Sequence, residues 1–197
     1  MPDAAPLSLR RNAIIAVAYI ATYIALDWAS YIHPVAQLAI TPWNPPPGLS
    51  LFLLLRYGLR YAPALLVAAF AADLVVRGAP FPPLLTLAPA LVLATGYTAV
   101  GALLSGRFGI GRSLSGLHDV NRFVTAALLA PLVIAPAYVG LHVALGDLST
   151  SDFLGAVVQF WIGDAIGIVV TTPLLLEFAQ RRLAPRAPFD VELALQT

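Results

Sequence analysis

Six apolar runs, each close to the length needed to cross a lipid bilayer, dominate this sequence of 197 residues. A transmembrane helix needs about 20 predominantly apolar residues. The runs, separated by arginine, proline and glycine, occupy residues 13–31, 38–55, 61–76, 84–104, 123–145 and 153–178. Hydrophobic residues make up 59% of the chain and charged residues only 11%. The sequence therefore predicts an all-α integral membrane protein with about six transmembrane helices.

The eleven basic residues, all of them arginine, predict the orientation of these helices. With the N-terminus in the cytoplasm, Arg77 lies outside and every other arginine lies inside. The inner set is Arg10, Arg11, Arg56, Arg60, Arg107, Arg112, Arg122, Arg181, Arg182 and Arg186. Cytoplasmic loops carry an excess of arginine and lysine, so this distribution places both termini in the cytoplasm. If residues 38–55 formed an outer loop and not a crossing, the arginines would be distributed over both sides of the membrane.

The chain divides into one membrane domain, residues 1–180, and a charged, proline-containing tail, residues 181–197. The tail is expected to be a cytoplasmic linker toward an output domain outside this chain. The first apolar run is longer than the 7–15 residues of a signal-peptide core, so it is expected to stay as a membrane anchor. The absence of cysteine excludes disulfides and thiolate chemistry.

The second run begins with a proline-rich stretch, "TPWNPPPG", from Thr41 to Gly48. Because proline removes amide donors and clashes with the preceding turn, residues 41–47 are predicted to be extended, with a helix beginning near Gly48. One interpretation is a broken crossing whose half-helix aims its amides at a cavity. The alternative is an outer loop followed by a short helix. Both place Trp43 and Asn44 in the outer half.

Three carboxylates lie in the outer half of the predicted spans, and a charge in hydrocarbon costs at least about 2.5–3.5 kcal/mol. With a rise of about 1.5 Å per residue, Asp27 and Asp73 lie roughly 9 and 7 Å below the outer ends of their helices, and Asp164 lies about 16 Å deep. Asp27 and Asp73 are also shallow enough to be interfacial carboxylates, whereas Asp164 must be paired, protonated or solvated internally.

These carboxylates predict a polar chamber that opens outward. Tryptophans at this depth also fit an aromatic belt, and His142 also fits a bond to a neighbouring helix. The candidate ligand-binding residues are Asp27, Trp43, Asn44, Gly48, Asp73, His142, Trp161 and Asp164. The predicted partners of Asp164 are the amides at Gly48, the Trp161 indole and His142.

Packing signals surround Asp164. Gly163 and Gly167 form a small-xxx-small pair that lets another helix approach closely. Pro173 interrupts the helical hydrogen bonds below, and Thr171 or Thr172 is expected to satisfy a released carbonyl. The residues with an expected structural role are Pro45, Pro46, Gly163, Gly167 and Pro173.

Two segments, "WNPPPGLSLFLLLRYGLRYAPALLVAAFAADLVV" and "FWIGDAIGIVVTTPLLLEF", carry a family resemblance. Together they resemble the membrane-associated sensor domain of the first type, the MASE family, over about residues 10–180. The matching positions are Trp43, Pro45, Pro46, Gly48, Trp161, Gly163, Asp164, Gly167 and Pro173. The resemblance implies a multi-helix module of the bacterial cytoplasmic membrane, fused to histidine kinases or diguanylate cyclases. It departs from that pattern because no output domain follows within this chain.

The residues do not predict catalysis by the chain itself. Residues 106–116 have scattered glycines without the spacing of a phosphate loop, and no zinc, nucleophile-elbow, kinase or cyclase motif is present. His33 and His142 lack a recognised metal spacing, so neither a metal nor a cofactor is expected. The expected partners are the lipid bilayer and a small ligand or a membrane protein, not nucleic acid; homodimer formation stays open.

Two functions fit the sequence. The first is a sensory input that relays a ligand or membrane state from the chamber to a cytoplasmic output. The alternative is the substrate-binding subunit of a small-solute uptake transporter, for which Ala21, Ala25 and Ala29 would form a docking patch. The sequence downstream of Thr197 would distinguish the sensory function from the transport function.

The arginine distribution predicts the sidedness of the loops. Reporter fusions after Arg112 and after Gln180 should register as cytoplasmic, and a fusion within residues 146–151 as extracytoplasmic. An extracytoplasmic signal from the Arg112 fusion would contradict the predicted orientation and the depth assigned to Asp164.

Overall fold

The computed structural model describes residues 8–31, 43–78, 82–110, 114 and 116–181, and in these residues every regular element is a helix. The predicted all-α class is therefore confirmed. The helices are α1 (Leu9–Tyr31), α2 (Pro46–Tyr57), α3 (Ala62–Val75), α4 (Pro83–Ala102), α5 (Leu117–Ala144) and α6 (Phe153–Arg181). Short helical turns are η1 (Leu59–Tyr61), η2 (Leu103–Arg107) and η3 (Thr150–Asp152).

Four stretches are long and apolar enough to cross a membrane. They are Leu9–Ser30, Pro83–Arg107, Leu117–Ala144 and Thr150–Arg181. The helices in the second and third apolar runs, α2 and α3, have only 12 and 14 residues, fewer than the roughly 20 of a full crossing. Residues 38–42 of the second run lie outside the described residues. The structure thus supports a membrane protein with four candidate spans, and six crossings stay a prediction.

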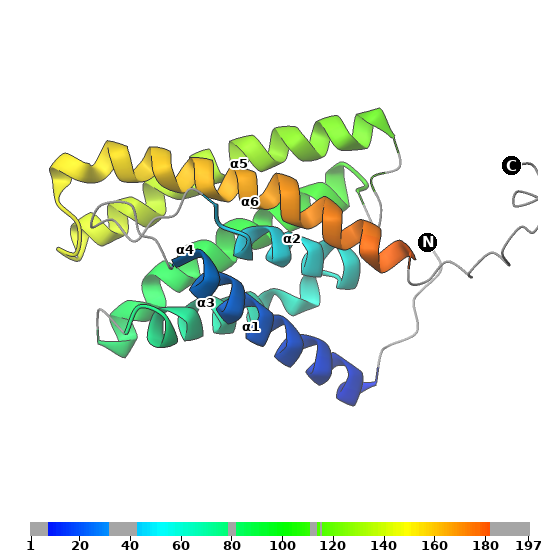
Figure 1. Cartoon of the computed structure of the whole chain (residues 1–197), viewed down its shortest axis with the longest axis horizontal. Helices are drawn as coiled ribbons and strands as arrows, with labels where there is room; N and C mark the ends of the chain where they lie inside the picture. The colour runs from blue at the N-terminus through cyan, green and yellow to red at the C-terminus, as the bar shows by residue number, and fades with distance from the viewer. Residues whose placement is uncertain (1–7, 32–42, 79–81, 111–113, 115, 182–197) are drawn as a thin grey trace, which may run out of the picture.

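Helix α2 lies at the centre of the molecule. Figure 1 shows α5 and α6 along one side, α1 and α3 along the other, and α2 between them. Helix α2 packs against α6, α4 and α1. Every residue from Pro46 to Leu55 except Phe52 is buried. A helix that is apolar and buried on all sides belongs to a core, so α2 is the central element around which the long helices pack.

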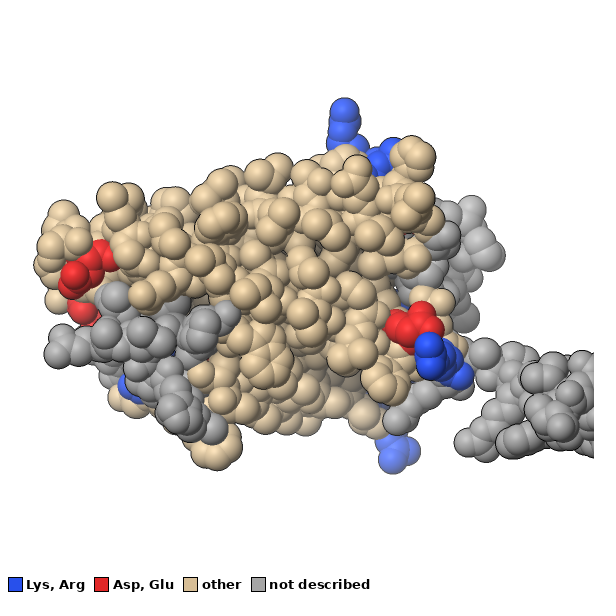
Figure 2. All heavy atoms as spheres, turned by 45° about the horizontal axis from the view of Figure 1, so that its top comes forward, with Lys and Arg blue, Asp and Glu red and all other residues tan. Residues whose placement is uncertain are grey.

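Helix α6 has two contrasting faces. One face is exposed and apolar, with a side chain at every fourth position: Val158, Ile162, Ile166, Val170, Leu174 and Phe178. The opposite face, which includes Gly163, Asp164, Gly167 and Thr171, is buried. Figure 2 shows a broad band without charged side chains between two ends where charges gather. This pattern fits a surface that faces lipid, and it turns Asp164 toward the protein interior.

The proline-rich start of α2 differs from the predicted structure. Pro45 is the N-cap, with φ −67° and ψ −29°, and the helix begins at Pro46, not near Gly48. The prediction was wrong because the amides of a first helical turn have no partner within the helix, so proline removes no hydrogen bond there. The fixed φ of proline also suits the first turn. Residues 41 and 42 lie outside the described residues.

Two glycines allow the backbones of α2 and α6 to touch. A Cβ atom on Gly167 would lie 1.7 Å from the Asn44 carbonyl oxygen. A Cβ atom on Gly48 would lie 2.6 Å from the Gly167 carbonyl oxygen and 2.7 Å from Cβ of Thr171. Most of these contacts are with backbone atoms, which cannot swing aside as a flexible side chain can. The start of α2 can therefore occupy its position only if both residues are glycine.

Replacing Gly167 by alanine should separate α2 from α6. The new methyl group overlaps the Asn44 carbonyl, so Gly167→Ala should lower the free energy of unfolding by about 1–3 kcal/mol or more. The matched control is Gly155→Ala in the same helix, where an added Cβ meets no atom within 4 Å. Thermal unfolding of the purified proteins in detergent compares the two variants. Equal stability of Gly167→Ala and Gly155→Ala would contradict the close contact.

Candidate functional site: a buried carboxylate between α2, α4 and α6

Asp164 is almost completely buried, with 1% of its surface exposed, yet both of its carboxyl oxygens have hydrogen-bond donors. The side-chain amide of Asn44 donates to Oδ1 over 2.7 Å. The hydroxyl of Tyr97 donates to Oδ2. Asn44 directly precedes Pro45, the N-cap of α2, and Tyr97 lies in the second half of α4. One carboxyl group on α6 therefore joins two other segments of the core.

Backbone groups strengthen the junction between the start of α2 and α6. The Asn44 amide donates to the Gly163 carbonyl over 3.1 Å. The Thr172 hydroxyl donates to the Gly48 carbonyl over 2.8 Å. Thr171 or Thr172 was predicted to satisfy a carbonyl released by Pro173 in this helix, whereas the Thr172 hydroxyl bonds to α2. The two motifs that are far apart in the sequence are therefore in direct contact.

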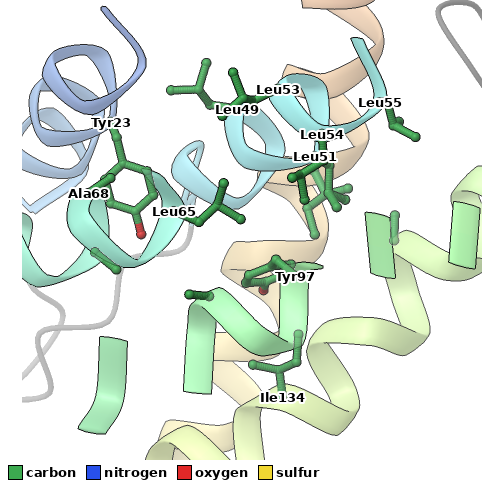
Figure 3. Packing of buried hydrophobic residues seen from close by; sticks show 14 of the residues in the cluster. Tyr23, Leu49, Leu51, Leu53, Leu54, Leu55, Leu65, Ala68, Tyr97 and Ile134 are labelled. Atoms are coloured by element: carbon green, nitrogen blue, oxygen red, sulfur yellow. The ribbon is translucent and has the colours of Figure 1, made fainter. Parts of the chain in front are cut away.

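Tyr97 is the functional candidate that the sequence analysis missed. The side chain is 3% exposed. Figure 3 shows the ring on α4 beneath Leu51 and Leu54 of α2. A buried tyrosine hydroxyl needs a hydrogen-bond partner, so a tyrosine in the centre of an apolar run was the available signal. Nothing in the local sequence indicated that the partner would be Asp164, which is 67 residues away.

The other two carboxylates form a second cluster around one guanidinium group. Arg77 contacts Oδ1 of Asp27 through NH2 and Oδ1 of Asp73 through NH1, both over 3.0 Å. Asp27 lies on α1, Asp73 on α3, and Arg77 shortly after α3. The two carboxylates are only 5% and 6% exposed, so they are not open interfacial groups. Arg77, which the sequence analysis assigned only to the outer side, holds α1 and α3 together.

The two clusters lie near each other in the core. The carboxyl group of Asp27 is close to that of Asp164. The Tyr138 side chain on α5 lies near Arg77, the carboxylates of the second cluster and Asp164. Each cluster nevertheless has its own hydrogen-bond partners, and the outward-opening chamber stays a prediction.

Three aromatic candidates lie apart from the hydrogen bonds of Asp164. The Trp161 indole donates to the Leu128 carbonyl on α5 over 2.7 Å. Nδ1 of His142 lies 2.9 Å from Oδ2 of Asp147. Trp43 is half exposed. The prediction that Trp161 or His142 satisfies Asp164 was therefore wrong, because residue depth alone does not say which way a side chain points. His33 lies outside the described residues.

The hydrogen bonds of Asp164 link three helical elements of the core. In the part of the chain that the structure describes, no three histidine, aspartate or glutamate side chains are grouped to hold a metal ion. Asp164 instead connects a short central helix, a neighbouring helix and the last long helix. A change in its charge or its hydrogen bonds would alter how these three elements pack.

Comparison with known proteins identifies the family. The MASE1 family model matches residues 10–187, which include both α2 and α6 and the contacts between them. Comparisons with curated proteins and with solved structures gave no match. Because the family match covers most of the chain, the protein belongs to the MASE1 family, the membrane sensory input domains of signalling proteins.

Proposed function

We propose that this domain relays its signal through the contact between α2 and α6, with Asp164 at the centre of the relay. The observation that carries this proposal is a buried carboxylate whose two oxygens accept hydrogen bonds from different helical segments. A sensor needs an element whose arrangement can differ between two states. Helix α2 suits this role because it is short, central and fixed to α6 at its first residues.

Helix α6 provides the path toward the output. It is continuous from Phe153 to Arg181, so a movement at Asp164 is carried over about 25 Å of helix to the last residues. Residues 181–197 then serve as a cytoplasmic linker to an output domain or partner protein. In this proposal the chain performs no catalysis and needs no cofactor; the chemistry belongs to the output that it controls.

The orientation follows from the ends of the helices. The first residues of α1, the end of α2, the start of α5 and the end of α6 lie toward one end of the molecule in Figure 1. Arginines accompany these ends: Arg10, Arg11, Arg56, Arg122 and Arg181. We assign this end to the cytoplasm, with both termini there, in the bacterial inner membrane. The pair α2 and α3 then supplies two further, shorter crossings, which makes six.

The stimulus acts at the opposite end, where Asp27, Asp73 and Arg77 lie. A ligand or a change in membrane state that favours one arrangement of these residues shifts the charge near Asp164 and the packing of α5. The stimulus can shift the output only by as much as its interaction free energy differs between the two arrangements. This is the outward-facing chamber of the sequence analysis, reduced to the residues that the structure brings together.

The variant Asp164→Asn tests the relay. Asparagine keeps a hydrogen-bonding side chain of the same size without the charge, so the protein should still fold, while the signal should be locked or uncoupled. With residues 1–197 fused to a diguanylate cyclase domain, cyclase activity in isolated membranes should change about fivefold or more. Thermal unfolding of the same purified fusion reports the stability.

The control is Glu177→Gln, which removes a carboxylate from an exposed position on the same helix. This variant should leave the cyclase activity close to that of the unmodified fusion. If Asp164→Asn matches the unmodified fusion in both stability and activity, Asp164 is not the centre of the relay.

A further inference from the structure

The cluster of Asp27, Asp73 and Arg77 carries an unbalanced charge. Two carboxylates share one guanidinium group, and each uses a single oxygen at 3.0 Å. With both carboxylates ionised and the nearby His142 imidazole neutral, these three side chains carry one negative charge in excess. The carboxyl side chains are 6% and 9% exposed, so water does little to compensate. Buried charges are normally paired, so one additional cation would neutralise the excess charge of this cluster.

One oxygen of the cluster also lacks a hydrogen bond. Oδ2 of Asp27 is buried and has no hydrogen-bond partner among the described residues. A buried acceptor without a donor is unfavourable, and such atoms are rare in folded proteins. This finding concerns geometry and is independent of the charge count. A single group that is both positively charged and able to donate a hydrogen bond would satisfy the two requirements together.

The surroundings favour an ammonium group over a metal ion. Hard metal cations need about six oxygen ligands, and the described residues contain no group of three acidic or histidine side chains placed for a metal. An ammonium group can be held by fewer acceptors. The aromatic side chains of Tyr23 and Tyr138 also lie near this cluster. Aromatic rings beside carboxylates are suitable surroundings for an organic cation.

We propose that Asp27 binds the ammonium group of a small primary amine through Oδ2, at the outer end of α1. Arg77 holds the other oxygen of Asp27 and fixes the orientation of the carboxylate. The site differs from Asp164, whose two oxygens already have donors. Arg77 is 23% exposed, which places the cluster near the molecular surface.

Binding has a consequence for the relay that rests on the proposed function. The negative charge of Asp27 acts on Asp164 across the core. A bound ammonium group would neutralise that charge and so change the electrostatic environment of Asp164. The binding step itself does not depend on the relay, and it is measured without any signalling output. A failure of binding and a failure of signalling are therefore distinguishable.

The test uses the purified 197-residue chain in detergent at constant pH and ionic strength. Methylammonium chloride is titrated against thermal unfolding, with tetramethylammonium chloride and potassium chloride as matched salts. Methylammonium should raise the melting temperature in a saturable way, by roughly 3–6 °C at ten times its dissociation constant. Tetramethylammonium lacks an N–H donor and potassium lacks any donor, so neither should give a saturable shift.

Two variants locate the site. Asp27→Asn removes the excess charge and should abolish the methylammonium shift. Asp147→Asn removes a carboxylate that is 42% exposed at the connection between α5 and α6 and should retain the shift. An equal shift in Asp27→Asn, or the same shift with tetramethylammonium, would overturn the proposal. The proposal would also be overturned if acid stabilised the unmodified protein and methylammonium had no effect. Should Asp27→Asn not fold, the comparison of the three salts decides.

Discussion

The hydrogen bonds of the Asp164 carboxyl group determine how the core is arranged. A carboxylate placed this deep in a membrane domain is unfavourable unless donors surround it. The two donors come from Asn44 and Tyr97, so the start of α2 and the second half of α4 must both bring a side chain within reach of Asp164 on α6. The positions of three helices are therefore linked through a single side chain. This link is the basis of the proposed relay.

Close backbone packing makes these hydrogen bonds possible. Asn44 reaches Asp164 only because its carbonyl oxygen can rest against Gly167, where any side chain would collide with it. The prolines after Asn44 start α2. They have no amide hydrogen, and the amides of a first turn have no partner within the helix, so no hydrogen bond is lost. The glycine pair, the prolines and the asparagine thus act as one unit. Their combination explains how the two segments that carry the family resemblance come into contact in this chain.

The sequence predicted the class of fold and part of the site, and the reasons for the rest are physical. Apolar runs predict the long helices, and the cost of a charge in lipid predicts the inward position of Asp164, because both follow from the residues along one helix. The hydrogen-bond partners Tyr97 and Arg77 could not be predicted in this way. They depend on which helices are neighbours, and residues 67 or 50 positions apart carry no mark of their contact. Depth placed His142 and Trp161 near Asp164 but could not give their direction.

The most direct test of the central claim is a double-mutant cycle between Asn44 and Asp164, measured as the free energy of unfolding in detergent. The variants are Asn44→Ala, Asp164→Ala and the double variant. If the two side chains are hydrogen-bonded as described, the double variant should be more stable than the sum of the single effects predicts, by about 1 kcal/mol. Single effects that add to within about 0.3 kcal/mol would show that the two residues do not interact and would contradict the account.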